Sequence, residues 1–221
     1  MFDKEKYQSE HKEIFDWYRE KYKNRNSYLF VDGVSDAENY GGILFLLKEA
    51  YTSEDGCGEC NLVSDLAEGD LKGMWGRVCE WTSGIENTTK ESIFPFHRLS
   101  EKEKKQAFSH IAVINIKKVN GTPLSDDNDL KNYAEENAEM LKKEILGAEP
   151  KVIVCGNTFK YLKSAFDIKI NKNNENWYYW VDIGDLKDVL VIDYYHPSKS
   201  YPALLAYYGI TNIYQQALLN K

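Results

Sequence analysis

The sequence predicts an α/β protein, a three-layer α/β/α sandwich whose mostly parallel central sheet has about four strands. Two observations predict this class. Short apolar runs of at most about eight residues recur along the chain, and segments of helical periodicity separate them. Continuous apolar runs are typical of strands covered on both faces, as in parallel sheets. We expect a single domain over residues 1–221, with residues 1–26 as a helical extension packed on it.

The first element is an amphipathic helix over residues 2–22, which ends before the polar stretch 24–26. Its apolar and aromatic side chains recur at helical spacing: Tyr7, His11, Ile14, Tyr18 and Tyr22. Buried strands are predicted at residues 43–47, 111–116, 152–155 and 189–192. Helices are predicted at residues 70–81, 130–146, 158–166 and 202–219. Residues 177–181 are expected to form an edge hairpin with the last strand, turning at Gly184 and Asp185.

Composition excludes several classes of protein. Hydrophobic residues make up 43% of the chain, which excludes global disorder. No apolar run approaches the roughly 18 residues of a membrane span, and the charged residues after Met1 do not resemble a signal peptide. With four cysteines we expect a cytoplasmic protein with reduced thiols. The net charge of −7 argues against a non-specific nucleic-acid coat but leaves room for a small basic site.

Polar side chains lie where the predicted strands end, and ligands of open α/β sheets bind beyond those ends. Glu49 follows the first strand, Asn115 lies within the second, and His196 and Ser198 follow the last. An amide offers a donor and an acceptor, which suits the edge of a nucleobase. Structural alternatives remain: the carboxylate could cap a helix or lie in a solvated loop, the amide could satisfy backbone groups, and the histidine could serve a turn.

Three segments, in this order, resemble the uracil-DNA glycosylase superfamily. ILFLLKEAY at residues 43–51 resembles its first motif, in which an acidic residue follows a strand. Residues 110–162 resemble a second segment of the superfamily. In that segment a strand carries Asn followed by Lys, and a helix, another strand and another helix come after it. YHPSKSY at residues 195–201 resembles its second motif. The similarity runs from about residue 29 to 219 and implies the superfamily's fold, with a pocket that receives a base extruded from DNA.

The resemblance implies two catalytic residues. Cleavage of an N-glycosidic bond builds positive charge on the sugar and negative charge on the departing base. The carboxylate of Glu49 would stabilise the sugar cation and orient a water molecule. The imidazole of His196 would donate to a carbonyl oxygen of the base as its charge develops.

The resemblance also implies substrate-binding residues. Asn115 would read the edge of the base, Tyr51 matches a tyrosine that excludes thymine in some members, and Ser198 would contact a phosphate. Trp75 is the candidate for stacking on the base, with core packing in a helix as its alternative. Two departures stand out. Lys48 replaces a glycine of the first motif, and residues 199–201 replace a leucine wedge.

We expect a locally positive pocket rim, since four lysines fall near the strand ends: Lys48, Lys117, Lys118 and Lys199.

No cofactor and no metal are expected. Some branches of the superfamily hold an iron–sulfur cluster bound by four cysteines. Two of those cysteines correspond here to Val119 and to a position at about Asn137, and neither is a cysteine. A zinc site remains an alternative, because its ligand types are present in Cys57, Cys60, Cys79 and His97, although the paired spacing of a zinc motif is incomplete.

We therefore expect a DNA N-glycosylase-like protein that binds an extruded base, uracil or another damaged base, and hydrolyses its glycosidic bond. Its expected partner is DNA or a nucleobase-containing ligand. Two alternatives remain: an inactive relative that binds a nucleobase, nucleic acid or protein partner, and a hydrolase of free nucleosides or nucleotides.

Overall fold

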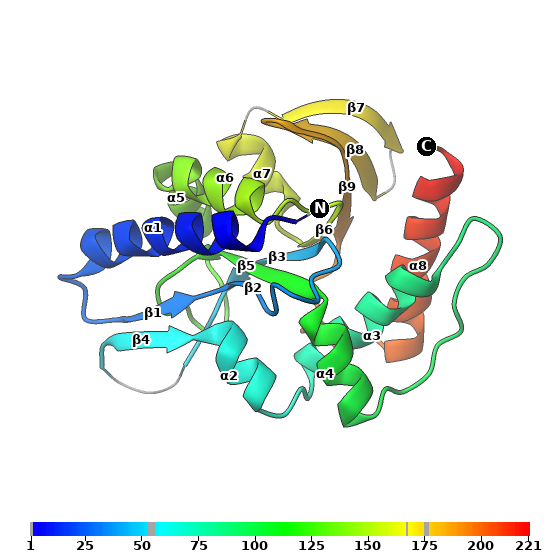
Figure 1. Cartoon of the computed structure of the whole chain (residues 1–221), viewed down its shortest axis with the longest axis horizontal. Helices are drawn as coiled ribbons and strands as arrows, with labels where there is room; N and C mark the ends of the chain where they lie inside the picture. Colours follow the sequence, from blue (N-terminus) through cyan, green and yellow to red (C-terminus); the bar gives the residue numbers. More distant parts are fainter. Residues whose placement is uncertain (1, 53–55, 167, 175–176) are drawn as a thin grey trace.

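The computed structural model describes residues 2–52, 56–166, 168–174 and 177–221 (Figure 1). Its helices are α1 (Lys4–Tyr22), α2 (Leu62–Glu68), α3 (Met74–Asn87), α4 (Glu101–Ser109), α5 (Asp127–Glu136), α6 (Ala138–Gly147), α7 (Phe159–Ala165) and α8 (Ala203–Leu219). Its strands are β1 (Tyr28–Val31), β2 (Gly33–Val34), β3 (Ile43–Glu49), β4 (Gly58–Asn61), β5 (Ile111–Lys117), β6 (Val152–Gly156), β7 (Ile168–Asn174), β8 (Tyr178–Ile183) and β9 (Leu186–Tyr194). None of the helices in this described part of the chain is long and apolar enough to cross a membrane.

The central sheet is mixed and larger than the sequence predicts. Within the described residues it has seven strands, in the order β2-β5-β3-β6-β9-β8-β7. The four inner strands, β5, β3, β6 and β9, are parallel and coincide with the predicted strands. Strand β2 adds to one edge in antiparallel sense, and β8 and β7 add to the other. The α/β class is confirmed, whereas the expectation of about four mostly parallel strands is wrong.

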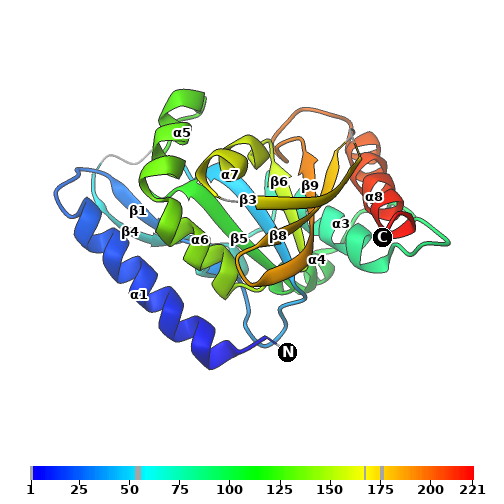
Figure 2. The same ribbon diagram turned by 90° about the horizontal axis from the view of Figure 1, so that it is seen from above.

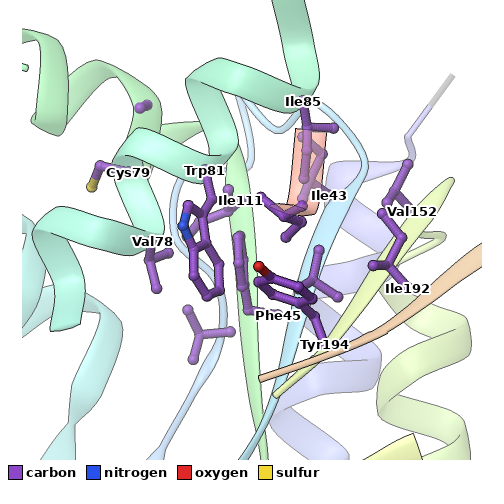
Figure 3. Close-up of a cluster of buried hydrophobic side chains, with 14 of the residues drawn as sticks. Ile43, Phe45, Val78, Cys79, Trp81, Ile85, Ile111, Val152, Ile192 and Tyr194 are labelled. Atoms are coloured by element: carbon purple, nitrogen blue, oxygen red, sulfur yellow. The ribbon is translucent and has the colours of Figure 1, made fainter. Parts of the chain in front are cut away.

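Helices cover both faces of this sheet (Figures 1 and 2). Helices α5, α6 and α7 lie over one face, and α3, α4 and α8 lie over the other. The side chains of β3 alternate between them, since Leu44 and Leu46 enter the first core and Phe45 and Leu47 the second. Figure 3 shows Phe45 in the second core together with Trp81 of α3 and Tyr194 of β9.

Helix α1 confirms the N-terminal amphipathic helix. The side chain of Asp3 caps it by accepting from the backbone N–H of Lys6. Its buried face packs against α6 and β1. Strand β1 pairs in parallel with β4, and its Phe30 N–H donates to the carbonyl of Lys118 at 2.7 Å. Neither β1 nor β4 belongs to the central sheet.

One predicted helix is two. Residues 130–146 were expected to be continuous, but α5 ends at Glu136 and α6 begins at Ala138. Asn137 lies between them, and its Nδ2 donates to the carbonyl of Tyr133 at 2.7 Å while its Oδ1 accepts from Lys21 Nζ at 2.6 Å. A side-chain amide that competes for backbone partners disfavours a straight helix, and here it ties the break to α1.

Other boundaries differ as well. The helix expected at residues 70–81 begins at Met74 and continues to Asn87. Helices α7 and α8 match their predictions within a residue at each end. The hairpin of β8 and β9 is confirmed, with its turn at Gly184, whose φ of 56° favours glycine.

Gly84 allows α3 and α8 to pack closely. A Cβ at this position would lie 2.6 Å from Thr211 Cγ2 and 2.7 Å from Tyr207 Cε2, both on α8. We predict that Gly84→Ala lowers the free energy of unfolding by about 1–3 kcal/mol, the usual cost of overpacking. The matched control is Gly147→Ala at the end of α6, where the nearest atom would be 3.5 Å away. Urea denaturation measures both variants, and equal stabilities would contradict the prediction.

Candidate functional site

The order of the strands places a crevice at the end of β3. Strand β3 lies between β5 and β6 in the sheet. The chain runs from β3 to β5 on one side of β3, and then from β5 to β6 on the other side of β3. The connecting helices therefore cover opposite faces, and in such sheets ligands bind at the point where the strand order reverses. A cavity of about 700 Å³ lies there, beyond the carboxyl ends of the parallel strands. All six candidate residues from the sequence line it: Glu49, Tyr51, Trp75, Asn115, His196 and Ser198.

Glu49 presents a buried carboxylate to this cavity. It is the last residue of β3, and its side chain is 4% exposed. Lys117 Nζ lies 3.4 Å from Oε2, whereas Oε1 has no hydrogen-bond partner among the described residues. A buried acceptor without a partner is costly, so this oxygen is ready to accept from a water molecule or a ligand.

Gly121 makes room for the carboxylate. A Cβ on Gly121 would lie 2.4 Å from Glu49 Cδ and 2.6 Å from Oε2. Its backbone N–H donates to the carbonyl of Ala50 at 2.8 Å, which joins the loop after β5 to the end of β3. Gly121 was not among the candidates from the sequence, because nothing in its neighbours along the chain shows that it packs against Glu49.

Asp32 fixes the amide of Asn115, which is 2% exposed. Asp32 Oδ2 accepts from the backbone N–H of Asn115 at 2.7 Å and from its Nδ2 at 2.9 Å. Because Nδ2 is held by Asp32, the orientation of the whole amide group is set. Asn115 is thus both a structural amide, as the alternative interpretation held, and a residue that lines the cavity.

Asp32 belongs to a buried charge cluster behind the cavity. Lys118 Nζ lies 2.5 Å from Asp32 Oδ1 and 2.8 Å from Glu144 Oε2, and all three side chains are at most 1% exposed. Burial raises the pKa of Glu144 well above its usual range, which favours its protonated form. The expectation that Lys118 lies on the pocket rim is therefore wrong.

His196 is held as a neutral ring. Its Nδ1 accepts from the backbone N–H of Ser198 at 3.3 Å and lies 2.8 Å from Ser198 Oγ. With Nδ1 as the acceptor, the proton of the neutral ring resides on Nε2. Burial, together with the positive charges of Lys48 and Lys199, lowers its pKa to about 4. At neutral pH the ring is therefore an uncharged N–H donor.

Arg77 clamps the loop that carries His196. Its guanidinium donates to the carbonyl of Pro197 at 2.7 Å, to that of Tyr201 at 3.3 Å, and also to that of Lys199. Three carbonyls held by one planar cation fix the backbone on both sides of Ser198. Arg77 lies on α3 and was not among the candidates, since its partners are distant in sequence.

Aromatic side chains line other parts of the cavity. Trp75 fits both of its interpretations, because it packs edge-on against Phe108 with ring centroids 6.2 Å apart and also lines the cavity. Tyr51 is 51% exposed. Phe30 of β1, which the sequence analysis did not single out, lines the cavity as a buried ring.

Of the four lysines expected at the rim, Lys48 and Lys199 line the cavity. The expectation is wrong for Lys117, which is buried outside the cavity lining and has its Nζ 2.7 Å from Asp129 Oδ2. Lys48 Nζ lies 3.6 Å from Asp127 Oδ1. Lys199 lines the cavity and forms no ion pair with any residue that the structure describes. Acidic neighbours thus offset part of the expected positive charge.

The zinc alternative gains no support. Within the described ranges, no group of three or more His, Cys, Asp or Glu side chains has an arrangement that could hold a metal ion. Cys79 is buried in α3.

A scan against models of protein families finds no match to this chain, and a search of curated proteins finds no match either.

The state of His196 can be measured. We predict that NMR titration gives a midpoint of about 4 and that ring ¹⁵N shifts show the Nε2–H tautomer. Lys48→Met should raise the midpoint, since it removes a nearby positive charge. The unfolded ring binds its proton near pH 6.5 and the folded ring near pH 4, so this group's contribution to stability is complete above 6.5 and is lost as pH falls towards 4. A midpoint near 6.5 or a proton on Nδ1 would contradict this assignment.

Proposed function

We propose that the cavity binds a nucleobase extruded from DNA and that the protein hydrolyses its N-glycosidic bond. The observation that carries the proposal is that Glu49, Asn115 and His196, from three separate strand ends, line one cavity. The resemblance of the surrounding segments to the uracil-DNA glycosylase superfamily supports it. A cavity of about 700 Å³ is large enough for a base and its sugar, within the usual range for ligand sites.

The two catalytic roles follow from the state of each side chain. As the C–N bond breaks, positive charge grows on the sugar, and the carboxylate of Glu49 stabilises it. Glu49 Oε1, which lacks a partner among the described residues, accepts a proton from the water molecule whose oxygen bonds to the sugar carbon. Negative charge grows on the base, and the Nε2–H of His196 donates to a carbonyl oxygen of the base. The departing base finally gains the proton that water loses.

Recognition of the base is assigned to the remaining candidates. The amide of Asn115, oriented by Asp32, contacts the edge of the base. An aromatic ring stacks on its face, for which Trp75 and Phe30 both line the cavity. Tyr51 lies at the mouth, where it restricts the size of the base. Ser198 positions His196 through its hydroxyl, and its exposed side chain would meet a phosphate of the strand.

One observation favours a non-catalytic alternative. Lys117 Nζ lies 3.4 Å from Glu49 Oε2, and a carboxylate in an ion pair stabilises a sugar cation less effectively. A protein that binds a nucleobase or nucleic acid without cleaving it would keep the same cavity. The two functions differ in whether an abasic site forms.

The test uses single- and double-stranded oligonucleotides that carry uracil or another damaged base, incubated with excess protein and then cleaved at abasic sites with alkali. We predict strand cleavage with the wild-type protein and a loss of at least about 100-fold with Glu49→Gln, the order expected when one electrostatic group is removed. Gly121→Ala should also lower the rate, because its Cβ displaces Glu49.

Controls separate the outcomes. Gly147→Ala, far from the cavity, should cleave like the wild type. Base release from mononucleosides would favour a nucleoside hydrolase. If no substrate in the panel yields abasic sites while free base still binds, the non-catalytic alternative replaces the proposed hydrolysis.

A further inference from the structure

Three exposed aromatic side chains lie side by side next to the cavity. Trp177, Tyr195 and Tyr201 are 40%, 39% and 45% exposed, respectively. The ring centroids of Trp177 and Tyr195 are 5.2 Å apart, and those of Tyr195 and Tyr201 are 4.8 Å apart. Large aromatic rings are costly to leave in water, so a continuous row of them marks a surface that binds something.

This aromatic row is anchored in the core. Trp177 and Tyr195 both contact the ring of Tyr194, with centroids 6.0 and 5.2 Å away. Tyr194 is buried against Trp81, as Figure 3 shows, and its hydroxyl donates to the carbonyl of Ala206 at 3.0 Å. The clamp of Arg77 on the carbonyl of Tyr201 holds the far end. Two of the rings therefore pack on a buried ring and the backbone of the third is held, which reduces the entropy lost on binding.

The row continues directly into the cavity wall. Tyr195 precedes His196, and Tyr201 follows Ser200, while His196, Ser198, Lys199 and Ser200 all line the cavity. Lys199 lies between the two tyrosines in the chain and adds a positive charge at this edge. The loop that carries Tyr195 and Tyr201 therefore also supplies His196, Ser198, Lys199 and Ser200 to the cavity wall.

We propose that Trp177, Tyr195 and Tyr201 form a stacking platform for unpaired bases that flank the nucleotide in the cavity, so that the protein binds single-stranded DNA. This inference rests on the proposed function, since the strand on the platform is the one whose base enters the cavity. Exposed rings beside a cation are the arrangement with which proteins hold single strands without reading sequence. In a duplex the bases already stack on one another and are not available to these rings.

The test is fluorescence anisotropy with a labelled oligothymidylate of about 12 nucleotides, within the site sizes known for single-strand binding, and with a duplex of the same length. The wild type should bind the single strand at least about 10-fold more tightly than the duplex. Tyr195→Leu and Tyr201→Leu should each weaken single-strand binding by about 5-fold or more, the loss expected for one base–aromatic stack. Tyr201→Phe should bind like the wild type, since it keeps the ring.

Trp17→Leu on α1 is the control and should leave binding unchanged. Tyr201 is the most exposed of the three rings, so its replacement should disturb folding least. If Tyr195→Leu fails to fold, the binding of Tyr201→Leu tests the platform. The probe carries no damaged base, so binding is measured separately from base release. Unchanged binding by a folded Tyr201→Leu, equal affinity for duplex, or self-association through these rings without strand binding would overturn the platform, whether or not bases are released.

Discussion

The buried carboxylate of Asp32 holds the candidate site together. Asp32 Oδ2 accepts from Asn115, and Asp32 Oδ1 pairs with Lys118. The backbone carbonyl of Asp32 accepts from the ring of His11 on α1 at 2.6 Å. Because Lys118 also reaches Glu144 of α6, one cluster joins the N-terminal helix, strand β5 and a covering helix. Because Asp32 Oδ2 accepts from Nδ2 of Asn115 at 2.9 Å, the buried amide is held in one orientation. An oriented amide is what base recognition requires.

Different contacts position the carboxylate of Glu49 and the imidazole of His196. The ion pair with Lys117 and the space left by Gly121 place the carboxylate of Glu49. The backbone N–H of Ser198 and the clamp of Arg77 place the imidazole of His196. Each group is fixed by contacts to different elements, and only the strand order of the sheet brings them to one cavity. Chemistry at this site therefore depends on the sheet more than on any single loop.

The sequence predicted the parts of the fold that hydrophobic burial determines. The four inner strands are continuous apolar runs because helices cover them on both faces. The two edge strands of the central sheet were missed for physical reasons: β2 has only two residues, and β7 is rich in polar residues that need no apolar pattern at an edge. The break at Asn137 was missed because its partner Lys21 lies 116 residues away in the chain.

Some residues of the candidate site could also be predicted from the sequence, and others could not. Glu49, Asn115 and His196 were found because their positions at strand ends can be read from the sequence. Asp32, Gly121 and Arg77 act through contacts between elements distant in the chain, so no local pattern reveals them. Lys118 illustrates the reverse error. A lysine beside a strand end suggests an exposed rim, but a buried carboxylate draws it inward.

The most direct test of the central claim is a crystal structure of the protein soaked with free uracil and, separately, with other nucleobases. We predict planar density in the cavity, with the base within hydrogen-bond distance of the amide of Asn115 and of His196 Nε2, and with an aromatic ring against its face. A cavity that stays empty at saturating concentrations, or a base bound at another place on the molecule, would contradict it.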